Sequence, residues 1–145
     1  MTLPAPARDL SLLLGRIAVG LVFVAHGWQK LGTSGIDGTA AFFDSVGVPA
    51  ASAAAWFAAL VELLGGAALV VGLAVPVAGL LLLVDMVGAF VFVHAGAGLF
   101  VEQGGYELVL ALGAASLVLA AVGAGRFSAD HLLTGRSRAA QPAAA

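Results

Sequence analysis

The chain has 145 residues, of which 61% are hydrophobic and 10% charged, and its mean hydropathy is +1.09. Soluble domains carry about 25% charged residues, so this composition excludes a disordered chain and a free-standing water-soluble enzyme. A net charge of -2 with six lysines and arginines also excludes a surface that tracks nucleic-acid phosphates, and no nucleic-acid partner is expected. We therefore expect an integral membrane protein whose main partner is the lipid bilayer.

Four apolar stretches each approach the roughly 20 residues that a helix needs to cross a membrane. They cover about residues 10–31, 52–73, 76–95 and 106–122. Pro76 suits the first turn of the third stretch, where its missing N–H costs nothing. Because backbone in contact with lipid must satisfy its hydrogen bonds internally, we predict an all-α membrane protein with four transmembrane helices in an antiparallel bundle.

The segments outside these stretches define the domain organisation. Residues 1–9 form an N-terminal segment, residues 10–125 the transmembrane domain, and residues 126–145 a C-terminal tail that we expect to be disordered at its end. Residues 74–75 make a tight connection, whereas the longer connection after the first stretch contains Phe42 and Phe43 beside Asp44. Aromatic residues next to an acid favour a short interfacial helix there.

Charge outside the stretches predicts the orientation in the membrane. The side of the termini carries the basic residues Arg8, Arg126, Arg136 and Arg138, and the opposite side carries the acidic residues Asp37, Asp44 and Glu102. By the positive-inside rule, both termini should be cytoplasmic in a multi-pass protein of the cell (plasma) membrane.

Ionisable side chains inside the stretches mark a candidate site, because insertion of Arg, Lys or Asp at a helix centre costs about 2.5–3.5 kcal/mol. With a rise of about 1.5 Å per residue, Arg16 and Glu62 should share the middle of the membrane, and the depth of Asp85 makes it a third candidate for this layer. The outer mouth should hold His26, Lys30, His94 and Glu107.

Helical periodicity also predicts the direction in which each of these side chains points. Arg16, His26 and Lys30 share one face of the first helix, and the small residues around Glu62 turn it toward the bundle interior. Asp85 and His94 are nine residues apart, which places them about 180° apart on a straight helix. A bend near Gly88, a subunit contact at Asp85 or irregular backbone around residues 94–98 would each resolve this conflict.

Each of these groups also has a purely structural explanation. Arg16 and Glu62 would form a buried ion pair that only fixes helix register, and Lys30 would be an interfacial anchor. Glu107 would be a helix-start carboxylate favoured by the macrodipole, and the histidines would be solvated or bonded to backbone. The sequence leaves these alternatives open.

Four blocks of residues, in order, make the chain resemble the DoxX family of small four-helix membrane proteins. The resemblance runs from about Leu12 to Leu133, and Asp85 is not part of the family pattern. The blocks are Gly15-Arg16 with His26-Gly27-Trp28-Gln29-Lys30-Leu31; Val61-Glu62-Leu63-Leu64-Gly65-Gly66 with Gly72-Leu73; Met86 and Ala89 with His94 and Gly98; and Gly104-Gly105-Tyr106-Glu107 with Gly123-Ala124-Gly125-Arg126-Phe127-Ser128-Ala129-Asp130.

The resemblance implies a function in membrane redox chemistry. The family is named for a subunit associated with thiosulfate:quinone oxidoreductase, and its members are linked to membrane redox and oxidative-stress complexes. The chain has no cysteine, which excludes thiol redox chemistry and thiolate metal sites, and no metal site is expected. Electrons would therefore pass through a bound cofactor or a soluble redox partner.

The first hypothesis is a quinone-interacting subunit of a membrane redox complex. Reduction of a quinone needs protons, which a histidine or carboxylate near water can supply. The candidate proton-relay residues are His26, Glu62, His94 and Glu107, and the candidate quinone pocket is formed by Arg16, His26, Lys30, Glu62 and His94. If the chain is catalytic, we expect it to be so only within a quinone-linked oxidoreductase.

Two other functions are alternatives to the quinone-interacting subunit, and only the second of them would use the same polar residues. A non-enzymatic scaffold or assembly factor for a soluble partner would fit the absence of a cofactor motif, while a small-solute transporter is disfavoured by the lack of internal repeats. A bis-histidine haem between His26 and His94 is the weaker cofactor alternative to a quinone. The sequence leaves the oligomeric state open.

Overall fold

The structure is a computed structural model that describes residues 4–133, and every regular element in that range is helical. This confirms the all-α prediction. The elements are α1 (Ala5–Trp28), the π-helical turn η1 (Gln29–Thr33), α2 (Gly35–Ser45), α3 (Ala51–Leu60), the π-helical turn η2 (Val61–Gly65), α4 (Gly66–Val71), α5 (Val75–Ala89), the π-helical turn η3 (Phe90–His94), the 3₁₀ turn η4 (Val101–Gln103) and α6 (Glu107–Val122). A further helical turn covers residues 129–133.

Three continuous helical rods are long and apolar enough to cross a membrane: Ala5–Thr33, Ala51–Val71 and Val75–His94. The helix Glu107–Val122 is apolar but shorter. Many large apolar side chains are exposed on these helices, as at Leu64, Val84 and Leu110. Apolar side chains on the outside of a helix bundle are expected when acyl chains are the solvent.

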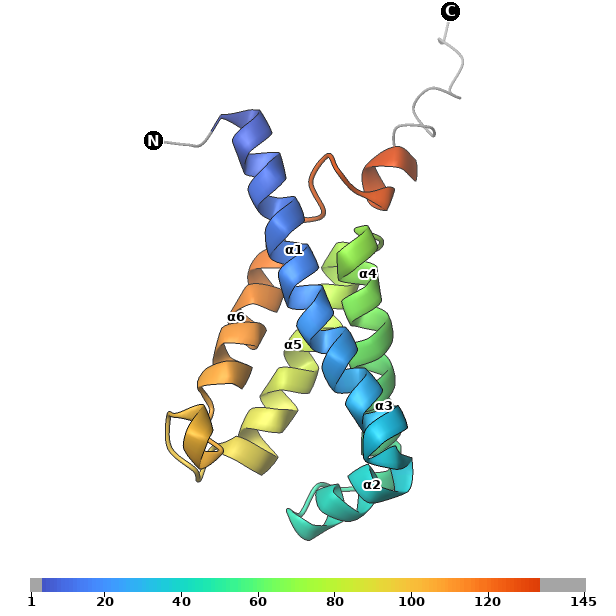
Figure 1. Cartoon of the computed structure of the whole chain (residues 1–145), viewed down its shortest axis with the longest axis vertical. Coiled ribbons are helices and arrows are strands. Elements are labelled where there is room, and N and C mark those ends of the chain that lie inside the picture. Colours follow the sequence, from blue (N-terminus) through green and yellow to red (C-terminus); the bar gives the residue numbers. More distant parts are fainter. Residues whose placement is uncertain (1–3, 134–145) are drawn as a thin grey trace, which may run out of the picture.

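The helices form two halves that spread apart toward one end of the molecule (Figure 1). In one half α1 packs along η2 and α4, and in the other α5 packs along α6. The short helix α2 packs on α3 and η1 at the end where the halves are widest apart. The helix α2 confirms the short helix predicted in the long connection between the first two apolar stretches. The start of α1 and residues 129–133 lie at the opposite end (Figure 1).

Glycines allow α1 to lie against the second rod with direct backbone contact. A Cβ atom added at Gly20 would lie 2.6 Å from the carbonyl oxygen of Gly66, and one added at Gly27 would lie 2.5 Å from the backbone nitrogen of Leu63. Small residues at such crossings permit the close packing that holds helices together in lipid. This contact fixes which residues of α1 face the second rod.

The segment that follows α6 folds back onto the end of the bundle where the chain begins. Asp130 accepts hydrogen bonds from the backbone nitrogens of Ala74 (2.8 Å) and Val75 (3.2 Å), at the first residues of α5. It thus provides the capping contacts that the exposed N–H groups of a helix start require. The disorder expected for the tail concerns residues 134–145, which lie outside the described residues.

Candidate functional site

An ion pair joins the first two rods between their π-helical turns. The Nζ atom of Lys30, in η1, lies 2.6 Å from Oε2 of Glu62, in η2. The Glu62 side chain is 5% exposed and that of Lys30 is 21% exposed. A carboxylate buried this deeply requires a charged partner, and Lys30 supplies it.

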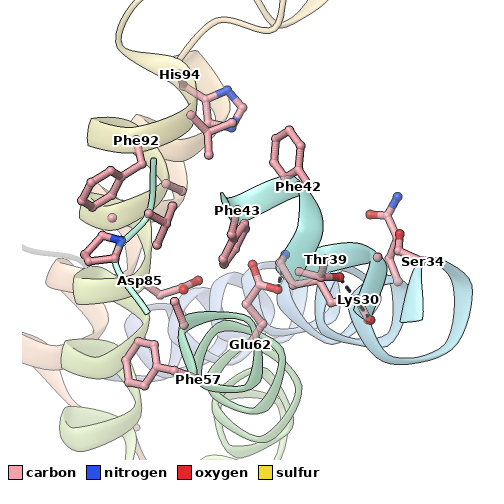
Figure 2. A pocket seen from close by; sticks show the side chains of 18 of the residues that line it. Lys30, Ser34, Thr39, Phe42, Phe43, Phe57, Glu62, Asp85, Phe92 and His94 are labelled. Carbon is pink, nitrogen blue, oxygen red and sulfur yellow. Dashed lines mark hydrogen bonds and ion pairs between the residues drawn. The ribbon is translucent and has the colours of Figure 1, made fainter. Parts of the chain in front are cut away.

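Asp85 of α5 brings a second carboxyl group to this ion pair from the other half of the molecule. It is buried and lines the same cavity as Glu62 and Lys30. Figure 2 shows its carboxyl group directed to the same space as that of Glu62. Two carboxyl groups and an ammonium group in one cavity form a site that can exchange a proton.

These groups form the polar floor of a cavity of about 530 Å³ between the two halves. A volume of a few hundred Å³ with mostly apolar walls and a few polar groups is typical of a small-molecule site. Four phenylalanines and the hydroxyl-bearing Thr39 contribute to the walls, and His94 lies at the rim (Figure 2). The lining residues are Gln29, Lys30, Ser34, Gly38, Thr39, Phe42, Phe43, Val48, Pro49, Ala54, Phe57, Glu62, Val84, Asp85, Gly88, Ala89, Phe92, Val93 and His94.

Three of the ionisable residues of the cavity lie in π-helical turns: Lys30 in η1, Glu62 in η2 and His94 in η3. A π-helical turn inserts a residue into the α-helical repeat and occurs often at functional sites. The inserted residue in η3 removes about 100° from the angle of about 180° expected between Asp85 and His94. Irregular backbone is therefore the resolution found, at residues 90–94, and both side chains line one cavity.

His94 is held at the rim by the connection to α6. Its Nδ1 donates a hydrogen bond to the carbonyl oxygen of Gly104 at 2.6 Å. That bond fixes which ring nitrogen carries the proton and leaves Nε2 to accept one. The imidazole can therefore pass a proton at the edge of the cavity.

The expected proximity of Arg16 to Glu62 is wrong. The guanidinium of Arg16 is buried at the other end of the second rod, where it donates to the carbonyl oxygens of Leu69 (2.8 Å), Val70 (2.7 Å) and Phe127. The depth estimate failed because it did not include the register in which the rods pack: Gly20 lies against Gly66 and Gly27 against Leu63, which leaves Arg16 beside the C-terminal end of the second rod. Arg16 thus joins the first and second rods to the segment after α6 and is not part of the cavity.

Two other residues of the predicted pocket also lie outside the cavity. His26 is half-buried on α1 and is not among the lining residues. The Oε1 atom of Glu107 accepts a hydrogen bond from the backbone nitrogen of Val101 (2.8 Å), so this carboxylate holds the loop before α6. Of the predicted set, the structure brings together Lys30, Glu62 and His94.

The sequence reasoning left Asp85 unresolved and outside the candidate site, and it did not single out the phenylalanines of the cavity. Asp85 had a usable signal, since a carboxylate in the middle of an apolar helix points to a functional interior site. Phe42 and Phe43 lacked one, because only the folding of α2 over the second rod brings them to the cavity.

Known proteins resemble the chain over most of its length. The family model described as DoxX matches residues 11–95. The chain is 33% identical to the Bacillus subtilis protein named "Putative oxidoreductase CatD", over 77% of this chain and 79% of that protein. It is 34% identical to "Uncharacterized membrane protein Rv3486" of Mycobacterium tuberculosis, over 89% of this chain and 85% of that one.

A third relative is "Inner membrane protein YphA" of Escherichia coli, 30% identical over 86% of this chain and 91% of that protein. No solved structure matches the chain. The matched region contains the second and third rods, the first rod from residue 11 onward and every residue that lines the cavity. The chain belongs to the DoxX family of membrane proteins.

Proposed function

We propose that the chain is a subunit of a membrane redox complex and binds the head group of a quinone in the cavity. The observation that carries this proposal is the buried cluster of Lys30, Glu62 and Asp85 at the floor of a cavity with phenylalanine walls, inside apolar helices. The name of the B. subtilis relative, an oxidoreductase, points in the same direction.

The cluster suits the chemistry of a quinone. The ammonium of Lys30 has donors beyond the one that it gives to Glu62, so it can donate to a quinone carbonyl oxygen. Glu62 and Asp85 can supply a proton to the reduced oxygen or accept a hydrogen bond from the hydroxyl of a quinol. The flat ring would pack against phenylalanines, which favour offset or edge-on contacts with other rings.

His94 would connect the cluster to water. It lies at the rim of the cavity beside the loop that precedes α6, where a proton can enter from the aqueous side. A quinone takes up two electrons and two protons on conversion to the quinol. Because the chain has no cysteine, we propose that the electrons come from a soluble redox partner and the protons through His94 and the carboxyl pair. His26 and Glu107 have no role in this route, since they lie outside the cavity.

Quinone binding to the purified protein in lipid nanodiscs tests this function. Glu62→Gln and Asp85→Asn remove the charge while keeping the shape, and each should weaken binding about tenfold or more, since a hydrogen bond to a charged group contributes about 1.5–3 kcal/mol. Glu107→Gln is the matched control, because it changes a carboxyl group outside the cavity and should leave the affinity unchanged. Unchanged affinity in both cavity variants would contradict the proposal.

We also propose that α6 is a fourth transmembrane helix and that both termini are cytoplasmic in the cell membrane. Arg8 and Arg126 adjoin the end of the bundle where the chain begins, while Asp37, Asp44 and Glu102 lie in the segments at the opposite end. The E. coli relative is named as an inner membrane protein.

Cysteine labelling tests this topology without background, because the natural chain contains no cysteine. An impermeant thiol reagent added to whole cells should label Ser45→Cys and leave Arg126→Cys unlabelled until the cells are opened. The reverse pattern would contradict the proposed orientation, and labelling of both positions from outside would contradict an even number of spans.

The alternative function, a non-enzymatic scaffold or assembly factor, also uses a soluble partner and makes a different prediction. A scaffold would retain its partner regardless of Glu62 and Asp85, whereas a quinone-binding subunit would lose the activity of the complex when they are replaced. Purification of the complex with Glu62→Gln followed by an assay of quinone reduction separates the two. Full activity with the partner retained favours the scaffold.

A further inference from the structure

The cavity walls continue onto the outer surface of the membrane-spanning rods. Phe57 of α3, Val84 of α5 and Phe92 of η3 line the cavity, yet they are 43%, 59% and 39% exposed. The carboxyl groups at the floor, those of Glu62 and Asp85, belong to buried residues. Because these rods are apolar enough to cross a membrane, their exposed flanks face acyl chains. The cavity is therefore open toward lipid.

A glycine leaves a notch in this wall. Val84, Gly88 and Phe92 follow one another at intervals of four residues, so Gly88 lies between two large side chains on one stripe of the third rod. A Cβ atom added at Gly88 would meet no atom within 4 Å, although Gly88 lines the cavity. The space beside Gly88 is thus open and can hold a ligand group.

The arrangement of the helices explains why the wall is open here. α5 packs against η2 and α4, but it diverges from α3 toward the α2 end of the molecule (Figure 1). Figure 2 shows Phe57 and Phe92 on either side of Asp85, on the flank of the cavity away from Lys30 and Ser34. The polar residues at the α2 end therefore border one side of the cavity, and apolar exposed side chains border the other.

We propose that the flank bordered by Phe57, Val84 and Phe92 is a lateral opening, through which a long-tailed, membrane-dissolved quinone enters and in which its apolar tail remains, beside Gly88. This inference rests on the proposed function and names its ligand class: a lipophile with a hydrogen-bonding head group, and not a water-soluble quinone. The head group reaches the cluster of Lys30, Glu62 and Asp85, and the tail stays in contact with both lipid and protein.

The test compares two quinones with the same head group, one with a methyl group and one with a ten-carbon chain, in nanodiscs of constant lipid composition. Gly88→Leu fills the notch and should weaken binding of the long-tailed quinone about tenfold more than binding of the methyl compound, because it removes the tail's apolar contacts. The change in this ratio from the natural protein to a variant is insensitive to how each ligand partitions into lipid, because the partition coefficient of each ligand is the same in both measurements.

Gly15→Leu is the matched control. Gly15 is also helical, and a Cβ atom there would also meet nothing within 4 Å, but it does not line the cavity. Gly15→Leu should leave the ratio unchanged. Equal effects of Gly88→Leu on both ligands, or no effect on either, would overturn the lateral opening.

A second measurement on the unsubstituted protein covers the case in which Gly88→Leu does not fold. A long-tailed quinone with a photoreactive group in the tail should label peptides that contain Phe57, Val84 or Phe92. Labelling confined to Phe42 and Phe43 of α2 would overturn the proposal.

The two proposals fail in distinguishable ways. If the methyl compound binds and Asp85→Asn weakens it, but the tail and Gly88 have no effect, only the lateral opening is wrong. If neither quinone binds the unsubstituted protein, the proposed function itself is wrong.

Discussion

Lys30 and Glu62 form an ion pair at 2.6 Å that links the end of the first rod to the middle of the second. Both residues lie in π-helical turns, and the carboxyl group of Asp85 adjoins Glu62 from the other half of the molecule. The pair therefore contributes to the packing of the rods and also forms part of the floor of the cavity. Its contribution to stability and its contribution to ligand binding can be measured separately.

Replacing one residue of this pair should lower the free energy of unfolding more than replacing both residues. Lys30→Met leaves Glu62 buried without its partner, and loss of one member of a buried pair costs about 3–5 kcal/mol. Lys30→Met combined with Glu62→Gln should be markedly closer to the natural protein. Thermal unfolding in detergent, analysed as a double-mutant cycle, measures the difference. Strict additivity of the two changes would show that the pair contributes no coupling energy.

Arg16 should matter for stability and not for quinone binding. Its guanidinium serves three carbonyl oxygens, and the single ammonium in Arg16→Lys cannot serve all of them. We expect a loss of about 2 kcal/mol, since each hydrogen bond to a charged group contributes about 1.5–3 kcal/mol. Unfolding in detergent tests the loss, and quinone affinity below the melting temperature should stay unchanged. A selective loss of affinity would place Arg16 back in the site.

Ala74 offers a stabilising substitution. It precedes α5 with a φ of 47°, in the left-handed region. That region costs about 1–2 kcal/mol for a residue with a Cβ atom, whereas glycine adds about 0.4–1 kcal/mol of unfolded-state entropy. Ala74→Gly should therefore raise stability by about 0.5–1 kcal/mol.

The control for Ala74→Gly is Ala114→Gly. Ala114 is an exposed residue inside α6, where glycine lowers stability by about 1 kcal/mol. Opposite signs of the shift in melting temperature are expected for the two variants. A decrease for both would mean that the strain at Ala74 is smaller than the entropy that glycine adds.

Gly27 should tolerate no side chain. A Cβ atom there would lie 2.5 Å from the backbone nitrogen of Leu63, and both atoms belong to helical backbones that cannot move independently. Gly27→Ala should separate the first two rods and lower stability by about 1–3 kcal/mol, the usual cost of overpacking. Gly15→Ala, which would meet only open space, should be neutral or stabilising. Equal behaviour of the two variants in thermal unfolding would contradict the close contact at Gly27.

The helical rods and the short helix α2 were predictable because each depends on local sequence. Long apolar runs require helices in lipid, and the predicted stretches at 10–31, 52–73 and 76–95 lie within a few residues of the observed rods except at the start of α1. The aromatic residues beside Asp44 correctly predicted α2. The status of the fourth stretch as a span stays a prediction, since α6 is shorter than the other rods.

The candidate site was predictable only in part. Lys30, Glu62 and His94 were found by one rule, that a charged or ionisable group in an apolar helix needs an interior partner. The assignment of partners failed for Arg16, because counting residues along ideal helices does not give the register in which the first rod packs on the second. Asp85 was left unresolved for the same reason, since uniform helical geometry turns it away from His94.

By itself, the sequence determined membrane residence, the helical rods and the need to bury several ionisable groups, because hydropathy and charge act residue by residue. Only the tertiary structure decided which of those groups meet. The phase of a helix changes at each π-helical turn, and glycine contacts set how closely two rods approach. Neither effect follows from residue spacing. The pairing of Lys30 with Glu62 and the position of Asp85 in the same cavity depend on how the rods pack and not on spacing along the chain.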